Sequence, residues 1–127
     1  MHWFDRAFDS WARNRFKAII VAAGNSGGSI GSPGKGWNVI TVGAYDDNNT
    51  PSWSGDQMWA DSAYINPIST YNDREKPEVV AVGANVRAVG FNNVPLTRSR
   101  TSHATPQVAG LAALLIHREP LRRIFQR

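Results

Sequence analysis

Ser102 is the first candidate for a catalytic residue, because of its residue type and its neighbours in the sequence. It stands in RTSHATPQVAGLAALL, residues 100–115, ahead of small apolar residues at helical spacing. Pro106 is tolerated in the first turn of a helix, where its missing N–H has no intrahelical partner, so the pattern predicts a buried helix over 102–117. A serine at such a helix start either caps the free N–H groups or, beside a general base, attacks a carbonyl carbon. The residues themselves leave both roles open.

Asn25 is the second candidate. It stands in VAAGNSG, residues 21–27, directly after a continuous apolar run from Ala18 to Ala23. Unbroken hydrophobicity is typical of a strand buried on both faces, and parallel sheets build their sites where such strands end. An amide at that place could donate hydrogen bonds into a cleft, although Asn and Gly also serve simply to turn the chain.

Other motifs offer less. GSPGKG, residues 31–36, departs from the phosphate-binding loop, because Ser29 stands where the first glycine belongs and Gly36 where Ser or Thr belongs. The histidines have no evident partner for acid–base work or metal binding, so surface or interface positions are expected for His2, His103 and His117. We therefore expect no metal ligands among these residues.

Composition narrows the class of protein. The chain of 127 residues is long enough for one domain, and 42% hydrophobic with 19% charged residues is typical of a globular protein. No apolar run approaches the length of a membrane span, so no membrane partner is expected. The sequence contains no cysteine, which excludes disulfides and thiolate metal sites. The start, MHWFDRAF, lacks the pattern of a secretory signal, and the localisation stays open.

The formal charge of +4 raises nucleic-acid binding as an alternative. The basic residues lack an aromatic stacking platform, zinc-finger spacing and a base-reading motif, and a solvated charged end explains them equally well. No nucleic-acid partner is expected for this cluster: Arg98, Arg100, Arg118, Arg122, Arg123 and Arg127.

The elements that must position Ser102 and Asn25 can be outlined from hydrophobic patterning. Residues 3–16 predict an amphipathic helix, with Trp3, Phe4, Phe8, Trp11 and Ala12 near one face. Buried strands are predicted over 18–23, 38–44 and 78–84, separated by loops over 24–37 and 45–77. Strands between helices indicate an α/β fold, with a mostly parallel sheet flanked by helices. Loops this long are functional or lean on another part of a fold.

Taken together, four segments resemble the second half of the catalytic domain of the subtilisin-like serine proteases, the subtilases (peptidase S8). They occur in the family's order and cover roughly residues 17–117, which makes the joint match far more specific than any single motif. The resemblance implies a partial subtilisin-like layered fold, with residues 1–127 as a C-terminal portion of the domain. The segments are VAAGNSG, GSPGKGWNVITVGAYDDNN, KPEVVAVGANV and RTSHATPQVAG.

The resemblance also implies roles for individual residues. Ser102 corresponds to the nucleophile and Asn25 to the side-chain donor of the oxyanion hole, while Ala22, Ala23, Gly24 and Thr101 would contact the substrate. The substrate class would be polypeptides, and peptide cleavage would need no cofactor. Calcium occurs in the intact family fold but cannot be assigned from these residues.

Two departures from the family pattern limit this expectation. The triad runs in the order Asp, His, Ser, and neither the aspartate nor the histidine motif is present before Asn25. Arg100 occupies the family's glycine before Thr-Ser. We therefore expect that the isolated chain is inactive and that a missing N-terminal half would complete the catalytic domain. We also expect the strand over 18–23 to have an unpaired edge, which promotes association. The alternative is a pseudoprotease or peptide-binding module that keeps the cleft without catalysis.

Overall fold

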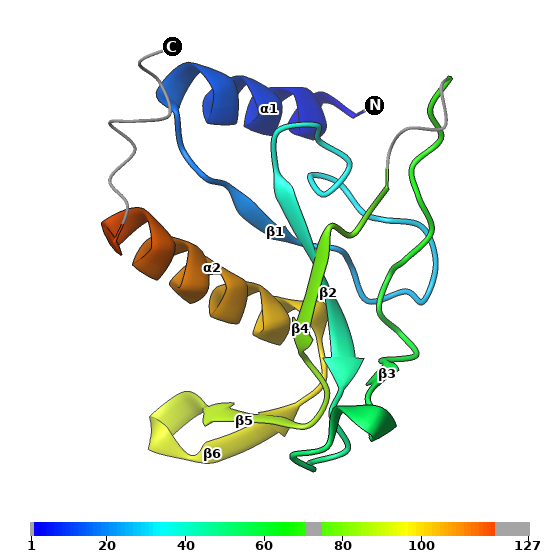
Figure 1. Ribbon diagram of the computed structural model, residues 1–127, viewed down its shortest axis with the longest axis vertical. Coiled ribbons are helices and arrows are strands. Elements are labelled where there is room, and N and C mark those ends of the chain that lie inside the picture. Colours follow the sequence, from blue (N-terminus) through cyan, green and yellow to red (C-terminus); the bar gives the residue numbers. More distant parts are fainter. Residues whose placement is uncertain (1, 71–74, 119–127) are drawn as a thin grey trace.

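A mostly parallel four-stranded sheet forms the centre of the molecule. The structure, a computed structural model, describes residues 2–70 and 75–118. Two helices and a separate two-stranded hairpin surround this sheet (Figure 1). The elements are α1 Trp3–Arg15, β1 Ile20–Ala22, β2 Ile40–Asp46, β3 Gln57–Met58, β4 Val79–Val82, β5 Val86–Val89, β6 Pro95–Arg98 and α2 Thr101–Arg118, with short 3₁₀ turns at Trp53–Gly55 and Phe91–Asn93.

β2 is the central strand of the sheet. It pairs in parallel with β1, where Val21 lies opposite Thr41, and with β4, where Val42 lies opposite Val79; β3 adds a short antiparallel pair. The apolar runs of β1, β2 and β4 favour this central position, since parallel strands need cover on their faces. The predicted α/β architecture is confirmed.

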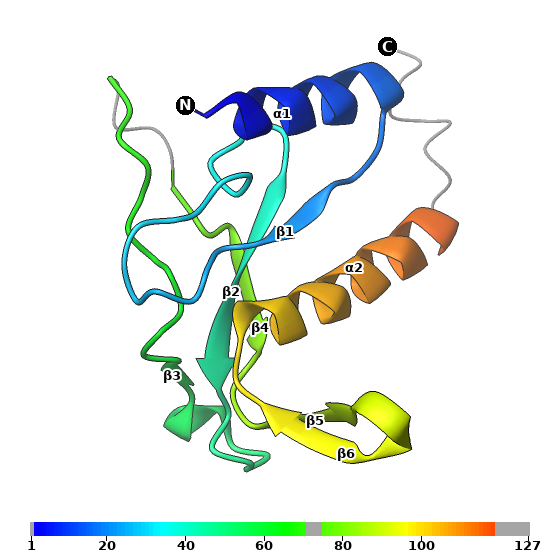
Figure 2. The same ribbon diagram turned by 180° about the vertical axis from the view of Figure 1, so that it is seen from behind.

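Helix α2 covers one face of this sheet and packs against β1, β2 and β4 (Figure 2). Its buried Ala104 lies against Val42 and Ala44 of β2, and a second buried cluster joins Ala23 to Ile30 and Ala63. The small side chains on α2 let the helix lie close to the sheet. This close packing fixes the helix start next to the end of β1.

Helix α1 agrees with the predicted helix to within one residue. The side chain of His2 accepts a hydrogen bond from the Phe4 N–H, and Asp5 accepts one from the His2 N–H, which together form a capping box. The helix ends at Phe16, whose φ of 50° is left-handed. The apolar face of this amphipathic helix is mostly uncovered, since Ala12 is buried but Trp3, Phe4 and Trp11 are exposed.

Two aspartates of α1 hold the loop that leads into β2. Asp5 accepts a hydrogen bond from Ser32 Oγ at 3.1 Å, and Asp9 accepts one from the Asn38 N–H at 2.7 Å. The buried Asp5 thus connects the first turn of α1 to the start of this loop. The segment over 32–38 is fixed at both ends, although its composition predicts only a loop.

The predicted burial of α2 is wrong over its second half. Thr101 and Ala104 are buried, but Leu111, Leu114 and Leu115 are exposed, Leu114 by 68%. These three side chains share one face of the helix, and no described residue covers that face. In the described residues, no helix has the length and apolarity needed to cross a membrane.

The strands are also less covered than their apolar sequences predict. Val79 and Val80 of β4 are exposed. Among the described strands, β1 pairs only with β2, so the expected unpaired edge at β1 is confirmed. Hydrophobic patterning identifies a strand by its apolar residues, but it does not specify which part of the molecule covers them.

The hairpin of β5 and β6 was not predicted. Val86 pairs with Arg98 and Val89 with Pro95, and the turn between them contains Asn92 and Asn93 with positive φ. Asparagine tolerates this conformation better than most residues. The hairpin lies inside the segment that precedes α2 and leads the chain to the helix start.

Candidate active site

Ser102 is the second residue of α2 and its side chain is exposed. Its Oγ makes no hydrogen bond with any other described residue. Because the first N–H groups of a helix have no intrahelical acceptor, the Ser102 N–H points out of the positive end of the helix as an available donor. One serine therefore offers both a hydroxyl and a backbone donor at the same place.

Asn25 lies beside this helix start and is also exposed. Its Oδ1 accepts hydrogen bonds from the backbone N–H of Thr101 at 2.8 Å and from Thr101 Oγ1 at 3.0 Å. Since a backbone N–H can only donate, the amide oxygen must face Thr101, and Nδ2 points elsewhere. No described residue accepts a hydrogen bond from Nδ2.

These contacts show which side chain caps the start of α2. The cap of α2 comes from the distant Asn25, so the prediction that Ser102 could cap its own helix is wrong. Asn25 likewise does more than turn the chain after β1. The structure brings the Asn25 amide and the start of α2 together through the buried Thr101.

Gly24 makes this approach of the chain to the helix possible. Its φ is +118°, a value that side-chain-bearing residues rarely adopt. Its N–H donates to Thr101 Oγ1 at 3.3 Å, and its carbonyl accepts from the Ala63 N–H at 3.0 Å. The turn after β1 is thus bonded to α2 on one side and to the 59–65 segment on the other.

A cleft of about 560 Å³ opens beside Ser102, between the edge of β1 and the first turns of α2. Of the four residues that the resemblance assigns to the substrate, Ala22 lines it. Ala23 is 0% exposed and packs in the core, Thr101 is buried, and Gly24 is half-buried. Among the lining residues, only Ala22 and Ser102 were predicted site residues. The full lining is Ile20, Val21, Ala22, Ser32, Pro33, Ser102, Thr105 and Pro106.

No general base accompanies Ser102 in the described part of the chain. His103 is its half-buried neighbour, but no hydrogen bond joins the two side chains. His2 caps α1, and His117 lies exposed near the other end of α2. Across residues 2–70 and 75–118, no three His, Asp or Glu side chains gather where they could hold a metal ion.

Arg100 fits its position without strain. Its φ is not in the left-handed region, its side chain is exposed, and its N–H donates to the Gly83 carbonyl at 2.8 Å. The close approach is made instead by Gly83, where an added Cβ would lie 2.4 Å from Ala44 Cβ and 2.8 Å from the Arg100 carbonyl oxygen. The basic residues Arg122, Arg123 and Arg127 lie outside the described residues.

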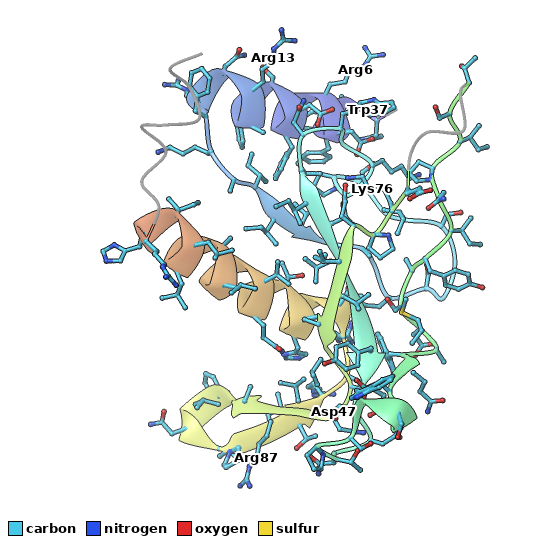
Figure 3. The ribbon with its side chains drawn as sticks, viewed as in Figure 1. Arg6, Arg13, Trp37, Asp47, Lys76 and Arg87 are labelled. Carbon is cyan, nitrogen blue, oxygen red and sulfur yellow. The ribbon has the colours of Figure 1, made fainter. Side chains whose placement is uncertain are left out.

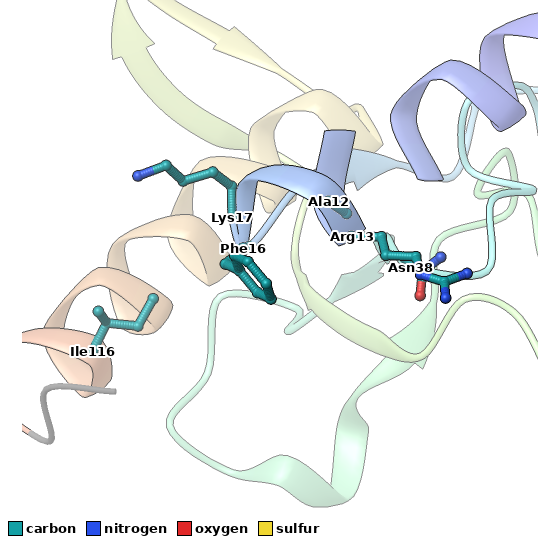
Figure 4. Close-up of a pocket in the computed structure, with 7 residues that line it drawn as sticks. Ala12, Arg13, Phe16, Lys17, Asn38 and Ile116 are labelled. Atoms are coloured by element: carbon teal, nitrogen blue, oxygen red, sulfur yellow. The ribbon is translucent and has the colours of Figure 1, made fainter. Parts of the chain in front are cut away.

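A second hollow, of about 710 Å³, lies between the ends of α1 and α2 (Figure 4). Its lining joins apolar atoms with the cationic side chains of Arg13 and Lys17, and it contains neither Ser102 nor Asn25. The lining residues are Ala12, Arg13, Phe16, Lys17, Ala18, Asn38 and Ile116.

Comparison with known proteins places these features in context. A sequence profile of the Subtilase family matches residues 4–123. Serine protease AprX of Bacillus subtilis (strain 168) is 40% identical over an alignment of 119 residues that covers 80% of this chain and 26% of AprX. Subtilisin Savinase of Lederbergia lenta is 34% identical over 110 residues, covering 86% of this chain and 35% of that protein.

Solved structures agree with the sequence matches. The S41 psychrophilic protease superposes with a TM-score of 0.75 at 34% identity, over 91% of this chain and 38% of that one. Sphericase gives a TM-score of 0.73 at 33% identity, over 90% of this chain and 38% of that one. The chain spans well under half the length of these relatives.

Proposed function

Because this chain belongs to the Subtilase family, we propose that it supplies the nucleophile and the oxyanion donors of a serine endopeptidase that acts on polypeptides. The observation that carries the proposal is the pair of hydrogen bonds from Thr101 to Asn25 Oδ1, next to Ser102. They hold the amide oxygen of Asn25 against Thr101, which leaves Asn25 Nδ2 and the Ser102 N–H as the donors that the proposal requires.

The chemistry follows from these positions. Ser102 Oγ forms a bond to the peptide carbonyl carbon while its proton passes to a base, and the carbonyl oxygen becomes negative. Asn25 Nδ2 and the Ser102 N–H donate to that oxygen, at the positive end of α2. Collapse breaks the C–N bond, the amine leaves with a proton, and water hydrolyses the acyl ester on Ser102. No step requires a cofactor.

The substrate would lie along the cleft at the β1 edge. Ala22 contributes its side chain there, while Ala23, Gly24 and Thr101 would contribute through backbone atoms, since Ala23 and Thr101 are buried. An exposed strand edge suits an extended peptide, because its free N–H and C=O groups pair with peptide backbone.

The base and the carboxylate that orients it would come from a partner, the N-terminal half of a subtilase catalytic domain. A serine hydroxyl is too weakly acidic to attack an amide efficiently without a base, and none contacts Ser102 in the described residues. We therefore expect that the chain alone does not cleave peptides.

The test is labelling by a fluorophosphonate probe, read by mass spectrometry at Ser102. We expect background labelling of the isolated chain and strong labelling, with peptide hydrolysis, once the preceding part of the AprX catalytic domain is fused to it. The Ser102→Ala fusion is the matched control. Strong Ser102-dependent labelling of the chain alone would refute the need for a partner, and a folded but unlabelled fusion would refute the nucleophile.

A pseudoprotease or peptide-binding module is the second candidate. Arg100 at the family's glycine and the unpartnered Ser102 favour it. Peptide binding that is unchanged by Ser102→Ala, and no cleavage by the fusion, would support binding over catalysis.

A further inference from the structure

The hairpin of β5 and β6 ends in an exposed apolar tip. Phe91 is 90% exposed and Val89 78%, and Val94 beside them is also exposed. Figure 2 shows the hairpin as a separate arm that extends away from the sheet beneath α2. Single exposed apolar residues are ordinary, but several that lie together mark a surface for a partner. We call residues 89–94 the hairpin tip.

Two arginines lie behind this tip, one on each face of the hairpin. Arg87 is exposed and precedes Val89 by two residues, and the exposed Arg98 pairs with Val86. Because neighbouring residues of a strand point to opposite faces, Arg98 shares the face of Val86 and Arg87 lies on the other. The Arg87 side chain points away from α2 (Figure 3). Neither guanidinium forms an ion pair with a residue that the structure describes.

The segment that contains the hairpin carries charge of one sign. Residues 79–118 include four arginines and neither aspartate nor glutamate. Positive charge next to exposed apolar side chains favours a partner that is anionic and that also accepts apolar groups at its surface. A bilayer with anionic headgroups has both properties.

We propose that the hairpin tip binds the surface of an anionic lipid bilayer. Segments that lie at a bilayer surface bury their apolar side chains about 5–10 Å into the boundary between headgroups and acyl chains. An antiparallel strand advances about 3.4 Å per residue, so Arg87 lies about 7 Å behind Val89. When Val89 and Phe91 enter this boundary, the two guanidinium groups are at the level of the lipid phosphates, which arginine binds through paired hydrogen bonds.

The polar groups of the tip suit a shallow position in the bilayer. The Gly90 N–H donates to the Val94 carbonyl at 2.8 Å, and the Val94 N–H donates to the Phe91 carbonyl at 3.2 Å. Backbone groups that are already paired cost less free energy to withdraw from water. Asn92 and Asn93 keep their side-chain amides, which suit the hydrated headgroup region and not the hydrocarbon core.

Surface binding differs from the membrane partner that the sequence argued against. No membrane partner is expected from the sequence because no apolar run is long enough to span a bilayer. That reasoning concerns spanning segments, whereas surface binding needs only a few exposed apolar and basic residues. The inference also does not depend on the proposed function, because the tip contains neither Ser102 nor Asn25.

The test is cosedimentation of the full chain with vesicles of phosphatidylcholine alone or of phosphatidylcholine and phosphatidylserine in equal parts. We expect binding to the anionic vesicles only. Phe91→Ser should weaken it about ten-fold or more, because a buried aromatic side chain is lost, and Arg87→Gln about five-fold. Leu114→Ser on α2 and Arg15→Gln on α1 change an exposed leucine and an exposed arginine outside the hairpin, and both should bind as the parent chain does.

A fluorescent label locates the contact without changing Phe91 or Arg87. Because the chain contains no cysteine, Val94→Cys carries a single environment-sensitive fluorophore, and Ser54→Cys, in the exposed 3₁₀ turn Trp53–Gly55, is the matched control. Anionic vesicles should shift the emission of the label at residue 94 to the blue and leave that at residue 54 unchanged.

Several results would overturn the proposal. They are a parent chain that binds neither kind of vesicle or both equally, a folded Phe91→Ser variant that binds as the parent does, and a label at residue 94 whose emission does not shift. Loss of binding in Leu114→Ser but not in Phe91→Ser would place the contact on α2 and refute a role for the hairpin tip.

Discussion

Asn25 Oδ1 lies 2.8 Å from the backbone nitrogen of Thr101, although the two residues are 76 positions apart in sequence. The same side chain caps α2 with its oxygen, while its Nδ2 donates to no described residue. Stability and the proposed chemistry therefore depend on different atoms of one amide, and substitutions can separate them.

Substitution of Asn25 tests this separation. Asn25→Ala leaves the buried Thr101 donors without a partner and should lower the free energy of unfolding by about 1–2 kcal/mol. Asn25→Asp keeps an acceptor at the helix start and should retain most of the stability, but it removes the Nδ2 donor and should slow hydrolysis by the AprX fusion. Urea denaturation measures the first effect and peptide hydrolysis the second.

Asn14→Ala is the matched control for stability. Asn14 is exposed and bonds only to Ser10 within α1, so the change should stay within about 0.5 kcal/mol. Equal losses for Asn25→Ala and Asn25→Asp would contradict the capping role.

Gly83 should tolerate no side chain. Gly83→Ala would place a methyl group against Ala44 and the Arg100 carbonyl, and we expect a loss of about 1–3 kcal/mol in the free energy of unfolding. Gly110→Ala is the opposite case: its Cβ meets nothing within 4 Å, and it should gain about 0.5–1 kcal/mol from helix propensity. Thermal or urea unfolding of the two variants should give opposite signs, and the same sign for both would count against the packing at Gly83.

The exposed leucines of α2 should drive self-association of the isolated chain. Replacing Leu111 and Leu114 by glutamate removes two of the three exposed leucines on this face and should shift sedimentation velocity profiles toward monomer. Trp53→Glu, at an exposed aromatic in a 3₁₀ turn, is the control and should leave association unchanged. A parent chain that sediments as a monomer at every concentration would contradict this prediction.

Asp5 should contribute to the stability of the fold, although it lies far from Ser102 in the sequence and has no part in the proposed chemistry. Asp5→Ala removes the acceptor of the His2 N–H and of Ser32 Oγ, and we expect a cost of about 1–3 kcal/mol. Asp56→Ala, at an exposed aspartate, should change unfolding by less than about 0.5 kcal/mol. If the two variants unfold at the same urea concentration, the Asp5 contacts contribute nothing.

Local patterning predicted much of this fold. Runs of apolar, often β-branched residues predicted the positions of β1, β2 and β4, and the residues around Pro106 predicted the start of α2. Each of these signals is contained in a few neighbouring residues. The hairpin was missed because β5 alternates between half-buried and exposed residues over only four positions and β6 is exposed throughout. The exposure of Leu114 was missed because hydrophobicity does not specify the covering surface.

The candidate site was predictable in part. The types and positions of Ser102 and Asn25 suggested their roles, but the cap of α2 by Asn25 joins distant segments and has no local signal. Ser32 and Thr105 enter the cleft only because α1 holds the 32–38 loop and α2 lies on the sheet. Tertiary packing decides such contacts.

The central place of β2 has a kinetic consequence during synthesis. β1 can pair with β2 once residue 46 has left the ribosome, but the other parallel partner, β4, follows only at residues 79–82. In that interval the nascent chain carries an apolar strand with one free edge, which is when such chains aggregate or bind chaperones. The parallel pairing of β2 with β4 therefore has to wait until the segment between them has been translated.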